Sequence, residues 1–322
     1  MANADCSSSY YDAIHALRKS FGVNGARVKF EMIPTAMCLA MAELMIPDSA
    51  AAIAEHIKAV GLLFQVYGPG VCKDGFPHKL FVGFRPLLTI QAIQHRHPTF
   101  LALPAWINTP FSTFGPSLMQ QLLNEAITLP SLLHQADLLI RNSALTIDSH
   151  TNQVFSSFVD LTSRLGNWET LLCVESGPPY WHSGNASDDT VLPLRYPNIT
   201  MANVFTHLWA LQIICMTEIK RLSSYLPRSS RGLYPQLGSS IDENDLLMIA
   251  LARKIYRSMD YLLQDEMELF GPASTFFPLR VAHQIFMADE SRYKMDIVFI
   301  EGIVDRLARK GLLSVHSFVF DI

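Results

Sequence analysis

Apolar residues recur along this chain at intervals of three or four positions, the spacing that gathers them on one face of a helix. One such stripe lies within residues 242–262, at intervals of four, four, four and three positions: Leu247, Leu251, Ile255, Met259 and Leu262. The alternation of apolar and polar positions that marks a half-buried strand forms no strong run, and no internal repeat is found. The pattern therefore predicts an all-α protein.

About ten helices are predicted, separated by proline, glycine and polar stretches. They cover residues 10–21, 30–46, 50–67, 79–95, 117–127, 129–141, 152–173, 196–224, 242–262, 277–288 and 294–310. Pro86 lies inside one of them, so that helix is expected to begin or kink there. Residues 97–116 form an aromatic and proline-rich loop, residues 175–193 a mobile surface loop or lid, and residues 226–240 a polar linker.

The length of the chain, 322 residues, fits one large helical domain over residues 1–322. Two lobes divided near residues 175–195 are the alternative. Residues 196–224 are the most apolar predicted helix, and their length matches a bilayer span. That helix contains four polar side chains that are costly in lipid: Asn203, His207, Gln212 and Glu218. We therefore expect a buried central helix and no membrane insertion.

Composition narrows the class of protein further. The formal net charge is −4, and no run of lysine and arginine resembles a nucleic-acid-binding tract, so no direct contact with nucleic acid is expected. The N-terminus lacks the basic and apolar regions of a secretory signal. The five cysteines form no CxxC pair. These features predict an intracellular, cytoplasmic protein, or a nuclear one, that is not secreted and holds no zinc site.

Several short motifs follow one another over residues 10–313. The sequence contains HIK at 56–58 with Gly61, RHPTFL at 96–101 with Trp106, and LPSLL at 129–133 with Asp137. It also contains WE at 168–169, YP at 196–197, IYRSMDY at 255–261, GP at 271–272 and FPLRVA at 277–282. In this order the motifs resemble the fungal-specific regulatory domain, or middle-homology domain, of zinc-binuclear-cluster transcription factors.

That resemblance implies a helical module that senses a ligand or inhibits its own protein. The DNA-binding module of the family needs six closely spaced cysteines that bind two zinc ions, and this sequence has no such cluster. The resemblance therefore implies a regulatory scaffold without its DNA-binding module, in which a homodimer is possible.

Chemistry-bearing residues are few. Asp188 and Asp189 lack the third carboxylate that magnesium-dependent terpene cyclases use, and nucleotide and hydrolase motifs are missing. We expect no metal and no cofactor. His207 is the candidate catalytic residue, because it lies inside the most apolar helix; a core histidine bonded to a neighbouring helix is the alternative.

The candidate substrate-binding residues are mostly aromatic: Trp209, Tyr261, Asp260, Trp181 and Phe277. Core or lid packing is the alternative for the aromatic ones. Arg280 is expected to form a buried pair with a carboxylate such as Asp260, with substrate contact as the alternative.

Two functions are compatible with this pattern. The first is a repurposed scaffold that binds an apolar small molecule and promotes its cofactor-independent cyclisation or rearrangement, such as an intramolecular cycloaddition in fungal secondary metabolism. Such a reaction needs a pocket that enforces the reactive shape and one or two hydrogen-bond donors. The second is a non-enzymatic transcriptional regulator that acts through a partner or a ligand. A truncated product that folds without a role is the third interpretation.

Overall fold

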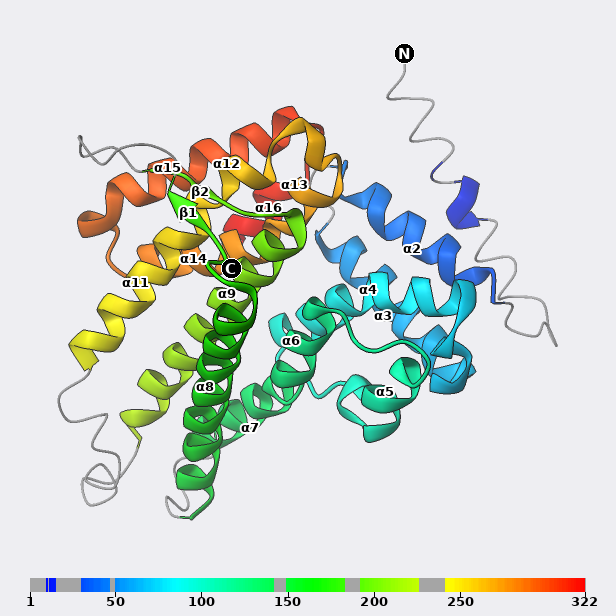
Figure 1. Ribbon diagram of the computed structural model, residues 1–322, viewed down its shortest axis with the longest axis horizontal. Helices are drawn as coiled ribbons and strands as arrows, with labels where there is room; N and C mark the ends of the chain where they lie inside the picture. The colour runs from blue at the N-terminus through cyan, green and yellow to red at the C-terminus, as the bar shows by residue number, and fades with distance from the viewer. Residues whose placement is uncertain are drawn as a thin grey trace.

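The computed structural model describes residues 10, 12–15, 30–46, 50–141, 149–182, 192–225 and 241–321. Helices make up most of these residues (Figure 1), which confirms the predicted all-α class. The α-helices are α2 (Met32–Glu43), α3 (Ala50–Tyr67), α4 (Gly75–Gln94), α5 (Pro104–Asn108), α6 (Leu118–Ala126), α7 (Leu129–Arg141), α8 (Ser149–Ser176), α9 (Ile199–Ser223), α11 (Ile241–Arg257), α12 (Met259–Leu262), α13 (Phe270–Ser274), α14 (Phe276–Met287), α15 (Glu290–Arg309) and α16 (Val315–Phe320).

Short elements fill the connections. Four 3-10 turns lie at η1 (Pro69–Lys73), η2 (Phe100–Ala102), η3 (Thr109–Phe111) and η5 (Asp265–Met267). The strands β1 (Trp181–His182) and β2 (Leu194–Arg195) pair antiparallel, with Trp181 opposite Arg195. They frame the stretch predicted as a loop or lid, whose residues 183–191 lie outside the described residues, as does the predicted linker 226–240.

The structure differs from the predicted helices in three places. The predicted 242–262 helix is divided at Ser258 into α11 and α12. The predicted loop 97–116 contains α5 and two 3-10 turns. The helix around Pro86 begins eleven residues earlier, at Gly75, and continues through the proline. Of the predicted first helix, only residues 10 and 12–15 are described, and these are helical.

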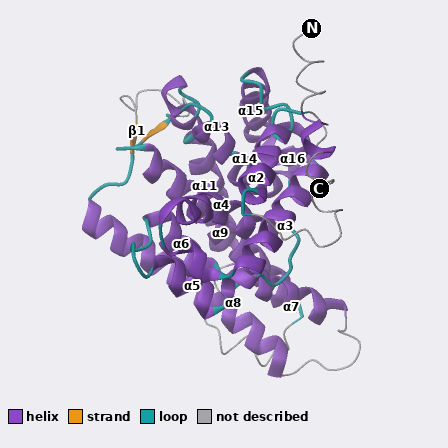
Figure 2. Ribbon diagram, turned by 90° about the vertical axis from the view of Figure 1, so that its right-hand side faces the viewer, coloured by secondary structure: helices purple, strands orange, loops and turns teal. Residues whose placement is uncertain are grey.

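Helix α9 lies deep among the other helices (Figure 2). The side chain of Asn198 accepts a hydrogen bond from the Met201 amide at 3.0 Å and so caps the helix. Eighteen of the 25 residues of α9 are buried, including every residue from Met201 to Ile213. The helix is apolar and long enough to cross a membrane, and 78% of its apolar window is buried inside the protein, as in the core helix of a soluble protein.

A network of four charges holds the C-terminal end of α9. Arg96, just after α4, donates from Nε to Asp137 of α7 at 2.6 Å and from Nη1 to Glu218 of α9 at 3.0 Å. Arg221 donates to the same two carboxylates, at 2.8 and 2.9 Å. Arg96 has a φ of 53°, a left-handed conformation that a non-glycine residue keeps only when its surroundings hold it. The network therefore fixes three helices at one point.

Asp137→Asn tests the stability of this network. Burial alone raises the pKa of Asp137, but hydrogen bonds from Arg96 and Arg221 outweigh burial and hold the pKa below its ordinary value. At pH 7 we expect the variant to lose about 2 kcal/mol of unfolding free energy, between the values for exposed and fully buried ion pairs. Chemical denaturation at several pH values measures the loss.

The pH dependence provides the control. A carboxylate with a lowered pKa stabilises the folded state above its unfolded pKa of about 4, and this contribution is lost as pH falls through the folded-state pKa. The difference between wild type and Asp137→Asn should therefore shrink in acid. A difference that stays constant down to the lowest pH would show that the charge of Asp137 does not stabilise the fold.

Candidate functional site

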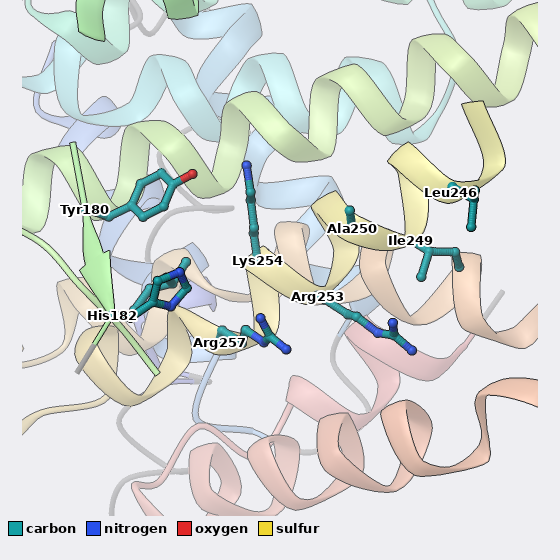
Figure 3. Close-up of a pocket in the computed structure, with 9 residues that line it drawn as sticks. Tyr180, His182, Leu246, Ile249, Ala250, Arg253, Lys254 and Arg257 are labelled. Carbon is teal, nitrogen blue, oxygen red and sulfur yellow. The ribbon is translucent and has the colours of Figure 1, made fainter. Parts of the chain in front are cut away.

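A groove of about 360 Å³ lies between α11 and the β1–β2 hairpin (Figure 3). Six of its lining residues come from α11: Leu246, Ile249, Ala250, Arg253, Lys254 and Arg257. Their intervals of three, one, three, one and three positions place them on one face of the helix. Tyr180, His182 and Leu194 line the groove from the hairpin side.

The α11 wall changes character along its length. Leu246, Ile249 and Ala250 form an apolar end, and the three cationic residues form the other end, next to the hairpin (Figure 3). From residue 246 to residue 257 the helix rises by about 16 Å. The groove is therefore amphipathic, with apolar and cationic ends separated by the length of a medium-sized organic molecule.

Arg253 is compensated by a carboxylate from a neighbouring helix. Its Nε and Nη2 atoms donate to the two carboxylate oxygens of Asp296 on α15, at 3.0 and 2.9 Å. The Tyr256 hydroxyl donates to the same carboxylate at 2.7 Å. Burial alone raises the pKa of Asp296, but the hydrogen bonds from Arg253 and Tyr256 lower it below its ordinary value. The charge of Arg253 is thus neutralised locally.

Lys254 and Arg257 have no such partner among the described residues. The Lys254 Nζ atom lies 5.5 Å from the Tyr180 ring centroid and 5.3 Å from that of Trp209, distances at which a cation is attracted to an aromatic face. The Nε atom of Arg257 is buried without a hydrogen-bond partner. Neither residue forms an ion pair within the described part of the chain. Among the described residues, Lys254 and Arg257 therefore carry two positive charges that no salt bridge neutralises.

Aromatic side chains support this cationic end from behind. Tyr180 contacts Trp209 edge-on at 5.5 Å and lies 6.0 Å from Tyr196, between ring centroids. Tyr196 is in turn 5.4 Å from Tyr261. The Trp209 indole is fully buried and donates to Glu169 of α8 at 3.3 Å. The aromatic rings link the hairpin to α9 and α12 and so hold the groove wall in place.

The predicted substrate-binding residues do not form one site. Trp209 and Tyr261 belong to the aromatic support, behind the groove rather than in its lining. Trp181 is 51% exposed on β1, beside the lining residue His182. Phe277 lies elsewhere, 5.8 Å from the ring of His207.

The expected pair between Arg280 and Asp260 is wrong. Asp260 accepts from Arg306 of α15 at 2.5 Å. Arg280 donates to the backbone carbonyl of Phe318 in α16 at 3.2 Å. Each side chain instead bonds to a helix that is close to it in space, which the spacing of residues 260 and 280 does not reveal.

His207 is buried in the helix core and does not line the groove. Its Nδ1 atom donates to the Asn203 carbonyl of the same helix at 2.8 Å. Burial lowers the pKa of His207 to about 4, although the hydrogen bond to Asn203 acts in the opposite direction. The imidazole is therefore neutral at physiological pH. His207 is therefore a core histidine, as in the alternative from the sequence, but its hydrogen bond goes to its own helix rather than to a neighbouring one.

The groove residues were absent from the sequence-based candidates. A signal existed in α11, because the face next to the apolar stripe carries Arg253, Lys254 and Arg257 at helical spacing. Their meeting with Tyr180 depends on the hairpin, which the sequence does not reveal. The described residues hold no group of three or more histidine, cysteine, aspartate or glutamate side chains able to bind a metal ion. The pair Asp188 and Asp189, which lacks the third carboxylate of a magnesium site, lies outside the described residues.

Comparisons with protein-family models, with curated proteins and with solved structures returned no significant match. The assignment of a function to the groove therefore depends on its own geometry and on the resemblance carried by the sequence motifs.

His207→Gln tests whether this histidine is buried in its neutral form. A base whose folded-state pKa is about 4 and whose unfolded pKa is about 6.5 stabilises the folded state above pH 6.5, and this stability is lost as pH falls to 4. We expect wild type to lose roughly 3 kcal/mol over that range from this group. His207→Gln should lack this loss in denaturation curves measured at pH 7, 5.5 and 4.

The matched control is the exposed His95. His95→Gln should keep the wild-type loss of stability between pH 6.5 and 4. Equal acid sensitivity in wild type and His207→Gln would mean that His207 is protonated in the folded protein, and the core interpretation would then be abandoned.

Proposed function

We propose that this chain is a ligand-binding helical scaffold, similar to a transcription-factor regulatory domain, whose α11–hairpin groove binds a small molecule with an apolar body and an anionic group. One observation carries the proposal. Lys254 and Arg257 lack carboxylate partners among the described residues, and they share a face of α11 with an apolar end. A ligand that is apolar at one end and anionic at the other complements both parts.

Electrostatics favours an anion at the cationic end. A partly buried cation without a counter-ion has lost water contacts that nothing replaces, and a bound carboxylate, sulfonate or phosphate replaces them. Hydrogen bonds to a charged group contribute about 1.5–3 kcal/mol each. The ligand is therefore not purely apolar, and the anionic group determines its orientation in the groove.

The apolar end adds affinity without fixing orientation. Leu246 is 62% exposed, so a bound alkyl or aryl group removes apolar surface from water, and each buried methylene contributes about 0.8 kcal/mol. A regulatory role follows if the occupied groove alters a contact with a partner protein. This is the non-enzymatic function that the sequence motifs suggest.

Cofactor-independent cyclisation in fungal secondary metabolism is the second candidate. The observation that favours it is the position of two cationic donors opposite the aromatic ring of Tyr180. Donors fixed in place stabilise negative charge that develops on a substrate oxygen during rearrangement. In this proposal Lys254 and Arg257 take the role that the sequence assigned to His207.

Decanoate is a suitable probe, because it joins an alkyl chain to a carboxylate. We expect isothermal titration calorimetry to show decanoate binding to the intact chain and decanol binding at least about tenfold more weakly, a difference of about 1.4 kcal/mol. Lys254→Met and Arg257→Met should each weaken decanoate binding by about tenfold or more, since each removes one charged donor.

Lys58→Met provides the matched control, because Lys58 is an exposed lysine of α3 outside the groove. It should bind decanoate as wild type does. Equal binding of decanol and decanoate, or unchanged affinity in both groove variants, would refute the assignment. Incubation of the chain with polyunsaturated carboxylates, followed by mass spectrometry and chromatography, separates cyclisation from binding alone, because a cyclised product has the same mass and a different retention time.

A further inference from the structure

Helix α15 runs along one edge of the molecule (Figure 1), and its outer face exposes apolar side chains. Met295 is 79% exposed, Val298 50% and Phe299 38%. The opposite face packs against the core, where it buries five apolar residues: Ile297, Ile300, Ile303, Val304 and Leu307. The helix has a non-helical residue at Tyr293, so its regular part begins at Lys294. An amphipathic helix of this kind normally leaves only polar residues outside, whereas the outer face of this one mixes apolar residues with charged ones.

The exposed face has an ordered arrangement around Val298. At 100° per residue, Lys294 and Glu301 lie on one side of Val298, and Met295 and Gly302 lie on the other. All five residues are exposed. Neither Lys294 nor Glu301 takes part in an ion pair within the described residues of this chain. On one side, a cation precedes Val298 in the sequence and an anion follows it. On the other side, a long side chain precedes Val298 and a glycine follows it.

We propose that this face of α15 packs antiparallel against the same face of a second copy of the chain, with the two-fold axis at Val298. A two-fold axis that relates two antiparallel helices reverses the direction along the helix. It preserves the lateral position, so that the side with Lys294 and Glu301 in one copy faces the same side in the other copy. Lys294 lies about 6 Å before Val298 along the axis, and Glu301 lies about 4.5 Å after it. The symmetry therefore places Lys294 beside the partner's Glu301, and this pair occurs twice.

The other side of the face is complementary in shape. The same operation places Met295 over the partner's Gly302, again twice. No heavy atom lies within 4 Å of the position that a Cβ on Gly302 would occupy, so the backbone is open to a neighbour there. A glycine inside a helix costs about 0.5–1 kcal/mol relative to alanine, and close approach of a second helix is one physical reason for a glycine at such a position. Flexible methionine side chains fill irregular gaps of this kind.

A second copy is favoured over an unrelated partner because the face is complementary to itself. Its positive and negative residues lie on one side at nearly equal distances from Val298, so no other sequence is needed to neutralise them. One helix pair buries less surface than a stable dimer does, and interfaces of this size are weak and transient. We therefore expect a dimer in reversible equilibrium with the monomer, whose charge pairs weaken with added salt.

Charge reversal on the full chain tests the register. Sedimentation equilibrium at low salt should show self-association of wild type at concentrations up to about 1 mM. Lys294→Glu places like charges together twice and should weaken association at least about tenfold. Exchange of both charges, Lys294→Glu with Glu301→Lys, recreates the pairs and should restore the affinity to within about threefold. Lys58→Glu, away from the face, should leave association unchanged.

Gly302→Leu tests the close approach separately. The leucine side chain blocks the position of the partner's Met295 and should abolish association, while thermal unfolding of the monomer should occur at an unchanged or higher temperature because glycine is a poor helix former. A chain that stays monomeric up to about 1 mM, or a double charge exchange that fails to restore association, would overturn the proposal. These outcomes are independent of decanoate binding in the groove.

Discussion

The all-round burial of α9 is the constraint on which the rest of the fold depends. A helix that is apolar on every side cannot be covered by one neighbour, and α9 contacts helices from both halves of the chain, including α6, α7, α8, α11 and α14. Apolar area removed from water contributes roughly 25 cal/mol per Å², so this covering is the main stabilising term that the helix brings. The cost is that every polar side chain on α9 must find a partner inside the protein.

Several polar side chains of α9 find such a partner, and the kind of partner differs with position, whereas the Asn203 Oδ1 and Gln212 Oε1 atoms are buried without a hydrogen bond. His207 bonds to its own helix backbone through the Asn203 carbonyl. Trp209 and Gln212 both donate to Glu169 of α8, which fixes the rotation of α8 against α9. Glu218, nearer the end, is buried within the arginine network. The hydrogen bond from Trp209 to Glu169 also holds the aromatic support behind the groove, because Glu169 and Tyr180 together orient the Trp209 indole.

The sequence predicts the helices well and the candidate site poorly, for a physical reason. Helical periodicity is a property of neighbouring positions, so the apolar stripe of α11 and the ends of most helices can be read from the chain. The groove joins residues more than sixty positions apart, Tyr180 and Lys254 among them, and a two-residue hairpin gives no periodic signal. The same limit explains why the predicted pair between Arg280 and Asp260 is wrong, since the partner of Asp260 is Arg306 on α15, which is distant in sequence. An isolated histidine in an apolar helix is likewise ambiguous, because its own backbone can satisfy it.

The described lining of the groove is cationic although the chain as a whole is acidic, and the arrangement of three neighbouring cations explains why. The chain as a whole has a formal charge of −4, and its many carboxylates are not distributed evenly. Asp296 lies where it reaches Arg253 with both oxygens. Glu169, the carboxylate bonded to Trp209, is already engaged by two donors of α9. Lys254 lies over the aromatic rings of Tyr180 and Trp209. Arg257 has a buried Nε atom that forms no hydrogen bond. Because charge in a partly buried site acts at short range and low dielectric, these two residues, rather than the net charge, dominate the electrostatics of the described groove lining.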